Sequence, residues 1–309
     1  MAITAAMVKE LREATGVGML DCKKALAETD GNMEAAVEYL REKGLAASQK
    51  KAGRVAAEGM VSALVDGKKA VVVEVNSETD FVAKNPVFQE FVGQVAIQAI
   101  ETSADDAEAM LNEPWKFDAS ASVADALSQK IAVIGENLKI RRFERFELEG
   151  SGKIVSYVHG TGRIGVLVEL ACEKEADELD ELGKNVAMQI AALNPKFIKS
   201  EDVPQEFVEH EKEMLARQAK EDPKNANKPD NIIEKMIAGR LQKELKEFCL
   251  IEQAYVKDSD MTVKTYIESV AKAIGVPSIE ITRFVRFETG EGIEKKEENF
   301  ADEVAKVMN

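Results

Sequence analysis

Acidic and apolar side chains stand next to one another in one short segment, residues 76–84. The carboxylates of Glu78 and Asp80 could act as an acid–base pair or bind a cation, since carboxylates exchange protons and ligate hard metal ions. Phe81 and Val82 follow them with no period that assigns them to a helix or strand face. Connecting segments normally face water, so the aromatic ring either folds back onto the next helix as a staple or contacts a binding partner.

The acidic residues of this segment favour neither metal binding nor catalysis. Together with Glu74 they supply three carboxylates, but their spacing does not form a cation-binding loop, and we expect them to be solvated. An acid–base pair of Glu78 and Asp80 would need a pocket and further polar groups, which the sequence does not indicate. We therefore predict no metal site and no catalytic residue here.

The rest of the chain also offers few catalytic groups. It has two histidines, His159 and His210, and three widely spaced cysteines, Cys22, Cys172 and Cys249, without C-x-x-C spacing. We expect the thiols to be buried or half-buried and His210 to face solvent. The P-loop, nucleophile-elbow and zinc-helix motifs are absent from the sequence. This inventory favours a binding protein over an enzyme and predicts no cofactor.

The composition limits the kind of partner. Lys and Arg number 41 and Asp and Glu number 56, which gives a net charge of −15. Such a charge repels phosphate backbones and anionic lipid, so we expect neither direct nucleic-acid binding nor membrane binding. With 45% apolar and 31% charged residues and no apolar run of about 20 residues, we expect a globular, cytoplasmic protein.

Helices should precede the acidic and aromatic segment. Apolar residues recur at helical spacing over residues 4–43, and glycine-containing breaks at 15–18 and 30–32 divide them into three short helices. Gly44 should close the last helix. The basic stretch 48–54 has no apolar face and should form a helical or flexible linker.

A strand pair and a helix should frame the segment itself. Runs rich in β-branched residues at 60–65 and 70–75 are joined by Asp66-Gly67, which predicts a hairpin. Asn85-Pro86 supplies a helix cap followed by proline at the first helical position, and apolar residues then recur at helical spacing to Ile100.

An internal repeat organises the rest of the chain. Residues 122–135 and 142–147 are echoed by residues 262–275 and 283–288, with one inserted residue, so two α+β halves should each contain a hairpin, helices and a closing strand. Between about residues 195 and 260, two apolar seams with charged flanks surround a polar turn at 223–229, which predicts a projecting helical hairpin.

These patterns predict an α+β fold: an N-terminal three-helix, ubiquitin-associated-like module, a duplicated core of two antiparallel-sheet-plus-helix subdomains, and an inserted antiparallel helical hairpin or coiled coil. The expected parts are a docking module with its linker (1–54), core subdomain N (55–148), the first part of core subdomain C (149–199), the helical hairpin (200–259), and the completion of core subdomain C with a C-terminal module (260–309).

Several segments resemble a known family in the same order along the chain. Residues 79–84 read TDFVAK, residues 15–26 read TGVGMLDCKKAL, residues 157–160 read YVHG, and the resemblance continues through GEGIEK at 290–295. Together they resemble bacterial translation elongation factor Ts over essentially the whole chain. One departure is Leu20, where the family often has a methionine, and this exchange keeps volume and apolarity.

The resemblance implies a guanine-nucleotide exchange factor that binds the GTPase elongation factor Tu and promotes GDP release. It implies that Phe81 wedges between GTPase helices beside the Mg²⁺ site while Asp80 contacts the displaced elements. The implied partner-binding residues are Thr79, Asp80, Phe81 and Val82 in the loop, and Arg12, Met19, Leu20, Ile134, Gly135 and His159 elsewhere.

Alternatives remain open for several of these residues. Met19 or Leu20 could instead belong to the core of the three-helix module, and His159 could be a locally hydrogen-bonded turn residue. An adaptor would explain the first 45 residues but would leave segment 79–84 and the duplicated core without a purpose, and an enzyme using Glu78 and Asp80 would need a pocket and polar partners that the sequence does not show. Self-association of the chain also remains open.

Overall fold

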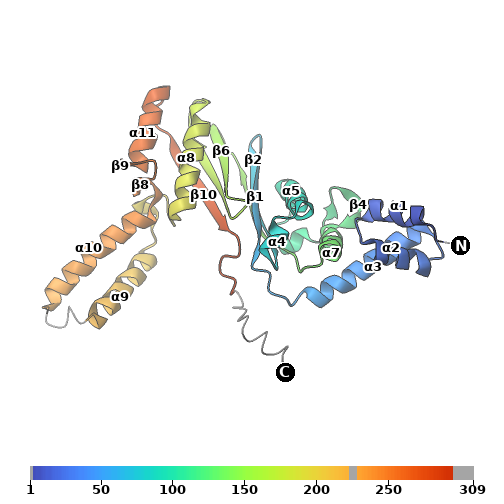
Figure 1. Cartoon of the computed structure of the whole chain (residues 1–309). Coiled ribbons are helices and arrows are strands. Elements are labelled where there is room, and N and C mark those ends of the chain that lie inside the picture. The colour runs from blue at the N-terminus through green and yellow to red at the C-terminus, as the bar shows by residue number, and fades with distance from the viewer. Residues whose placement is uncertain (1–2, 223–227, 295–309) are drawn as a thin grey trace.

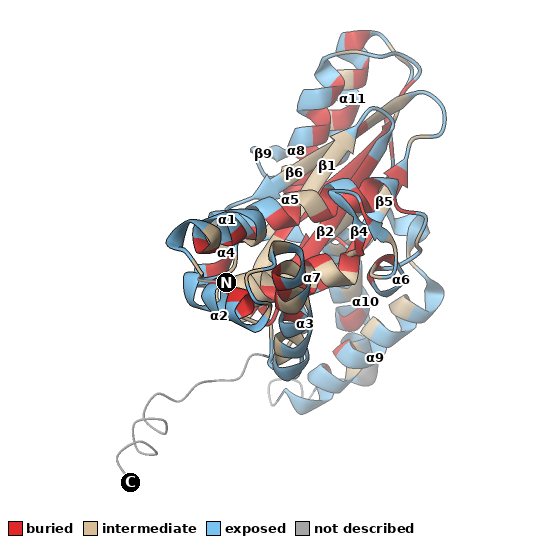
Figure 2. Cartoon of the chain, turned by 90° about the vertical axis from the view of Figure 1, so that its right-hand side faces the viewer, coloured by how far each residue is buried: buried red, intermediate tan, exposed pale blue. Residues whose placement is uncertain are grey.

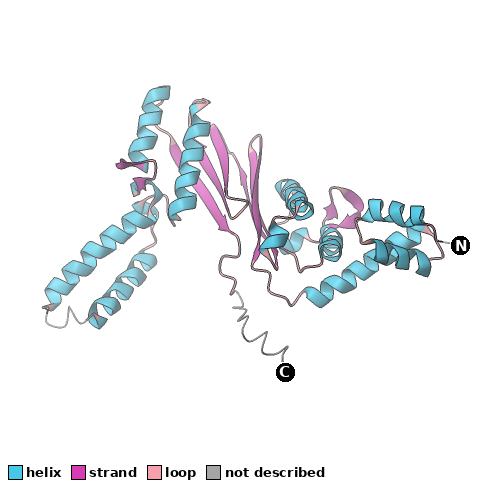
Figure 3. Ribbon diagram, viewed as in Figure 1, coloured by secondary structure: helices cyan, strands magenta, loops and turns pink. Residues whose placement is uncertain are grey.

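A computed structural model of the chain describes residues 3–222 and 228–294. It is an α+β fold in which the strands lie in the middle and helices lie at both ends, as Figure 3 shows. The N-terminal module consists of α1 (Ala5–Thr15), α2 (Met19–Glu28) and α3 (Met33–Lys51). Thr4 caps α1 at its start, and Gly16, in the left-handed conformation at φ 69°, ends it. The three predicted helices are therefore confirmed.

The prediction that Gly44 ends the third helix is wrong. Helix α3 continues to Lys51, and Gly44 is buried within it. A Cβ built on Gly44 would lie 3.6 Å from both the Cβ of Ala132 and the carbonyl oxygen of Ser128 in α7 (Val123–Ile134). Lys51 also donates to the carbonyl oxygen of Ile131 at 3.5 Å. Packing of α3 on α7 thus outweighs the low helix propensity of glycine.

The first half of the duplicated core is a three-stranded antiparallel sheet of order β1-β2-β5, covered by helices on one face. The predicted hairpin and the predicted helix after Pro86 are both confirmed. The elements are β1 (Glu58–Asp66), β2 (Lys69–Ser77), α4 (Asp80–Ala83), α5 (Pro86–Glu101), α6 (Ala107–Met110), β3 (Pro114–Trp115), β4 (Asp118–Ser122), α7 and β5 (Lys139–Glu147).

The second half repeats this arrangement with a sheet of order β10-β7-β6. The repeat is confirmed, and each half also contains a two-stranded ribbon that the sequence analysis missed. The elements are β6 (Gly152–His159), β7 (Ile164–Ala171), α8 (Glu178–Leu193), the 3-10 turns η1 (Ser200–Asp202) and η3 (Leu250–Glu252), β8 (Ala254–Tyr255), β9 (Asp258–Thr262), α11 (Val263–Ile274) and β10 (Glu280–Glu288).

The two sheets pack against each other at the centre of the molecule (Figure 1). Their facing side chains form one apolar cluster, made of Val61, Ala70, Val72, Phe146, Ile154, Leu167 and Phe287. Gly165 of β7 allows this approach, because a Cβ there would lie 2.3 Å from Val61 Cγ1. Figure 2 shows the buried residues concentrated on the strands and on the inner faces of the helices.

The inserted helical hairpin projects from the body, as predicted (Figure 1). It consists of α9 (Gln205–Glu221) and α10 (Asp230–Phe248), which bury Leu215, Ala219 and Ile237 between them. At its base, the ring of Phe207 makes edge-on contacts with those of Phe197 and Phe248. Most of the predicted turn at 223–229, and residues 295–309 of the predicted C-terminal module, lie outside the described residues.

Three further features bear on the sequence predictions. The thiols of Cys22, Cys172 and Cys249 are buried, as expected, and His210 is exposed. Among the described residues, no helix is long and apolar enough to cross a membrane.

Candidate partner-binding site

The segment that carries Phe81 contains a one-turn helix rather than an irregular loop. Thr79 caps α4 by accepting a hydrogen bond from the backbone N–H of Val82, and Asn85 caps α5 directly afterwards. Two closely spaced caps fix the path of the chain between β2 and α5. Residues 79–84 are called the Phe81 loop below.

Phe81 and Val82, consecutive residues of this turn, differ in burial. Phe81 is 80% exposed, whereas Val82 is 8% exposed and packs into the apolar core of the first half. Successive helical residues point about 100° apart, so burying Val82 turns Phe81 toward solvent. The staple interpretation of Phe81 is therefore wrong, and its ring is free to be buried by a partner.

Asp80 presents a negative charge beside the ring. Its Oδ2 accepts a hydrogen bond from Lys84 Nζ at 2.6 Å, one helical turn away, and both side chains are exposed. This hydrogen bond lowers the pKa of Asp80 below its ordinary value of 3.8, so the carboxylate is ionised at neutral pH.

The Phe81 loop is braced by residues that follow α7. Glu136 accepts hydrogen bonds from the backbone N–H of Thr79 at 3.0 Å and from its hydroxyl at 2.6 Å. In the other direction, Glu78 accepts the backbone N–H of Asn137 at 2.6 Å. Two glutamates thus tie the two segments together reciprocally, which holds α4 in place.

The linker after the three-helix module joins the same cluster. The side-chain amide of Asn137 donates to the carbonyl oxygen of Arg54 at 2.8 Å, and the Arg54 guanidinium lies 3.4 Å from Glu78. The linker, the Phe81 loop and the end of α7 therefore meet at one place. The sequence analysis missed the roles of Glu136, Asn137 and Arg54, because nothing in their local pattern distinguishes them from surface residues.

Ile134 and Gly135 lie directly beside this brace. Ile134 is half-buried against the core of the first half, and Gly135 is exposed and ends α7 at φ 89°. The left-handed conformation at Gly135 turns the chain so that Glu136 faces Thr79. Gly135 is therefore exposed next to the Phe81 loop, where a partner could contact it, whereas Ile134 exposes only part of its side chain.

The predicted docking residues of the three-helix module are exposed. Met19 is 51% and Leu20 76% exposed at the start of α2, and Arg12 is exposed on α1. None of the three belongs to the apolar core of the module, so the core interpretation of Met19 and Leu20 is wrong. A Cβ on Gly16, in the turn between them, would lie 3.8 Å from Val133 of α7. This turn therefore lies beside the end of α7.

His159 lies on the second half, at the end of β6. It is exposed, and its Nδ1 is 2.9 Å from the hydroxyl of Tyr157. The turn that follows reaches the first half, since Val61 N–H donates to the carbonyl oxygen of Gly162 at 2.7 Å. His159 thus has the local hydrogen bond that the turn interpretation expects and the exposure that a partner contact needs.

The geometry does not favour the enzymatic alternatives. Glu78 and Asp80 bind different partners, Asn137 and Lys84. The expectation that Glu74 is solvated is wrong, because its carboxylate is buried in a separate hydrogen-bond network. Among the described residues, no group of acidic, histidine and cysteine side chains could hold a metal ion. Cavities of 860 and 490 Å³ lie elsewhere, and no residue of the Phe81 loop lines them.

A glycine spacing of the dinucleotide-binding type, G-x-G-x-x-G at residues 160–165, also has a structural explanation. It lies in the turn between the antiparallel strands β6 and β7 rather than between a strand and a helix. No helix N-terminus follows these glycines to hold a phosphate, so this part of the chain does not form a nucleotide cradle.

Comparison with known proteins agrees with the resemblance noted from the sequence. A family model described as elongation factor TS matches residues 78–291. Proteins named elongation factor Ts are 54% identical over 309 residues in Clostridium novyi (strain NT) and 55% identical over 307 residues in Clostridium perfringens (strain SM101 / Type A). Another, from Clostridioides difficile (strain 630), is 53% identical over 308 residues. In each case 99% of both chains is covered, and the chain therefore belongs to the elongation factor Ts family.

Proposed function

We propose that this chain is a guanine-nucleotide exchange factor for the translational GTPase elongation factor Tu and promotes GDP release during polypeptide elongation in the cytoplasm. Family membership supports the choice of partner and pathway. The single observation that carries the mechanism is Phe81, an aromatic side chain 80% exposed on a turn that is capped and braced. Exposing such a ring is costly in water unless a partner buries it.

The proposed mechanism acts on the Mg²⁺ and phosphate site of the GTPase. A P-loop GTPase holds the diphosphate through a backbone cradle, a lysine and a Mg²⁺ ion, so displacing the elements around the ion weakens nucleotide binding. Phe81 would wedge beside this site, and the ionised Asp80 would contact the displaced elements. Thr79 and Val82 would fix the wedge, one through Glu136 and the other through the core.

The other predicted contacts would bind the GTPase without acting on the nucleotide. Arg12, Met19 and Leu20 would dock from the three-helix module, Gly135 and the edge of Ile134 would extend the surface of the Phe81 loop, and His159 would contact a distal part of the partner. No covalent bond is made or broken, so the mechanism assigns no catalytic residue and needs no cofactor. It also requires no second copy of the chain.

A nucleotide-release assay tests the proposal. Elongation factor Tu loaded with fluorescent GDP is mixed with excess unlabelled GDP and increasing amounts of the purified chain, and the release rate is followed by stopped flow. We expect the rate to rise and saturate with concentration. A rate independent of the chain would refute the proposal, and a rise confined to an unrelated GTPase would refute the choice of partner.

A further inference from the structure

Two glutamates occupy equivalent positions in the duplicated halves. Glu74 lies on β2 and bonds Arg142 Nε of β5 at 2.6 Å, whereas Glu169 lies on β7 and bonds Arg283 Nε of β10 at 3.0 Å. The sequence repeat aligns the two arginines, and the sheet orders β1-β2-β5 and β6-β7-β10 align the two glutamates.

Each arginine also packs on the opposite half. The Arg142 guanidinium lies 4.1 Å from the ring centroid of Phe287, and the Arg283 guanidinium lies 4.2 Å from that of Phe146. These are equivalent phenylalanines of the repeat. Each ion pair lies within one half and holds an arginine that packs on the other half, so the two arginine–phenylalanine contacts join the halves in a nearly two-fold arrangement, as in an isologous interface.

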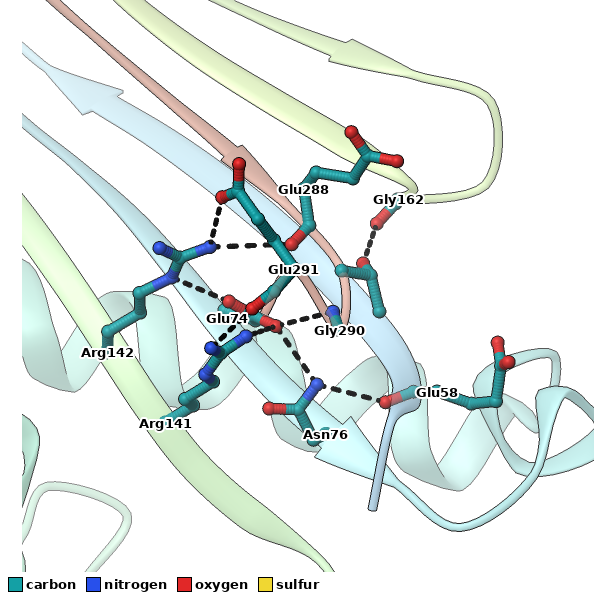
Figure 4. Close-up of polar contacts among 10 residues, drawn as sticks. Glu58, Glu74, Asn76, Arg141, Arg142, Gly162, Glu288, Gly290 and Glu291 are labelled. Carbon is teal, nitrogen blue, oxygen red and sulfur yellow. Dashed lines mark hydrogen bonds and ion pairs between the residues drawn. The ribbon is translucent and has the colours of Figure 1, made fainter. Parts of the chain in front are cut away.

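The two sites differ in what else each glutamate binds. Figure 4 shows Glu74 surrounded by donors: Asn76 Nδ2 at 3.0 Å, Arg141 Nη1 at 3.0 Å and the backbone N–H of Gly290 at 2.8 Å. Glu169 has one additional partner, the hydroxyl of Thr282 at 2.7 Å. A cavity of 490 Å³ opens beside Glu169, whereas Glu74 has no exposed surface.

The additional bonds of Glu74 lead toward the Phe81 loop. Asn76 is buried, and its amide also donates to the carbonyl oxygen of Glu58 at the start of β1. The next residue, Ser77, donates to the carbonyl oxygen of Thr79 at 3.0 Å, and Thr79 is held by Glu136. Hydrogen bonds thus hold Asn76 to Glu74 and Ser77 to Thr79, and the peptide bond between Asn76 and Ser77 links these two contacts into one path from Glu74 to the cap of α4.

The second half has no counterpart of this connection. Its residue equivalent to Asn76 is Ala171, which cannot form the side-chain bonds, and β7 is not followed by a one-turn helix. Gly290, which follows β10, has the left-handed φ of 73° that favours glycine, and a Cβ there would lie 2.1 Å from the carbonyl oxygen of Ala57. Only glycine therefore lets the backbone come close enough for its N–H to bond Glu74. The end of the second half is therefore fastened to the strand that leads to the Phe81 loop.

We propose that Glu74 is a positioning residue of the Phe81 loop, whereas its equivalent Glu169 only joins the two halves. The inference rests on the proposed exchange function for its effect on GDP release, but its effect on the loop can be measured in the free chain. Glu74 acts through Asn76, Ser77 and Thr79 and does not itself touch the partner.

The matched variants Glu74→Gln and Glu169→Gln separate positioning from general stability, since both keep the shape and remove a charge from equivalent ion pairs. Hydrogen exchange of the backbone amides of Thr79 and Val82 is measured in the free, full-length chain. We expect roughly tenfold faster exchange in Glu74→Gln and a change of less than about twofold in Glu169→Gln. Equal exchange in the two variants would overturn the proposal.

The release assay with elongation factor Tu gives the functional readout. In Glu74→Gln the release rate at saturation should fall about tenfold while the half-saturating concentration changes little. A displaced Phe81 slows GDP release within the complex more than it weakens binding of the chain to the GTPase. Glu169→Gln should keep both parameters. Equal losses of release rate in the two variants would overturn the proposal. If the wild-type chain itself did not accelerate release, the exchange function would be refuted, and hydrogen exchange of the Thr79 and Val82 amides would still test whether Glu74 positions the loop.

Asn76→Ala is the second variant in case Glu74→Gln does not fold. The second half carries Ala171 at the equivalent position, so alanine fits this strand environment. Asn76→Ala removes the side-chain bonds to Glu74 and to the carbonyl oxygen of Glu58 but keeps both ion pairs. Faster exchange of the Thr79 and Val82 amides would support the proposal, and unchanged exchange would overturn it.

Discussion

Replacing Phe81 by alanine should weaken partner binding without weakening the fold. A phenylalanine side chain offers about 150–250 Å² of surface, of which this one leaves 80% exposed. Burying about 120 Å² or more at about 25 cal/mol per Å² is worth about 3 kcal/mol. Alanine keeps the Cβ, so we expect a loss of about 2 kcal/mol or more, which is about 30-fold in affinity.

The neighbouring residue should respond in the opposite way. Val82 is 8% exposed within the core, so Val82→Ala removes buried methyl groups and should cost about 1.5–3 kcal/mol of stability. Phe81→Ala should change stability by less than about 0.5 kcal/mol, the usual range for surface positions. Adjacent residues on one short helix thus report separately on binding and on folding.

Urea denaturation and the GDP-release titration are measured on the same preparations. Phe117→Ala is the matched control, because Phe117 is another phenylalanine with an exposed ring, 46% exposed, outside the proposed contacts. It should leave GDP release unchanged. A Phe81→Ala chain with a much lower urea midpoint but normal exchange activity in its folded fraction would refute the assignment of Phe81 as the wedge.

Three further predictions concern the parts around the wedge. Deleting residues 1–50 should leave the duplicated core folded but lower partner affinity, and unchanged affinity by titration would argue against docking by the three-helix module. Deleting residues 204–246 and joining the ends with a short linker should spare most of the exchange activity, because the hairpin projects from the body. Complete loss of exchange activity in a variant with an intact circular dichroism spectrum would contradict this. Burial raises the pKa of Glu74, but hydrogen bonds led by that from Gly290 N–H outweigh it and leave the pKa below 4.5. The stability that this carboxylate contributes is therefore present above pH 4.5 and is lost as the pH falls through the lowered pKa. Urea midpoints between about pH 3 and pH 7 should accordingly vary less in Glu74→Gln than in the wild type.

Local patterns in the sequence predicted much of the fold. The Asp66-Gly67 turn between β-branched runs predicted the β1–β2 hairpin, and Asn85-Pro86 predicted the start of α5. The repeat predicted that α11 and β10 match α7 and β5, because equivalent sequences bury equivalent faces. These features depend on contacts between near neighbours or on comparison of two segments within the chain.

Features that depend on distant contacts were not predictable in this way. Gly44 continues α3 because α7 packs against it, and α7 lies far along the chain. The exposure of Phe81 could not be decided either, since one helical turn is too short to define a buried face. The brace from Glu136 to Thr79 spans 57 residues, and the bond from Gly290 to Glu74 spans 216. No local signal marks such pairs.

The affinity of the chain for elongation factor Tu, measured with and without saturating GDP, tests the central claim most directly. If the chain promotes release by weakening GDP binding, then GDP must weaken binding of the chain by the same factor, because both ligands share one thermodynamic cycle. We predict tight binding to the nucleotide-free GTPase and clearly weaker binding to the GDP form. Equal affinities for the two forms would contradict the account.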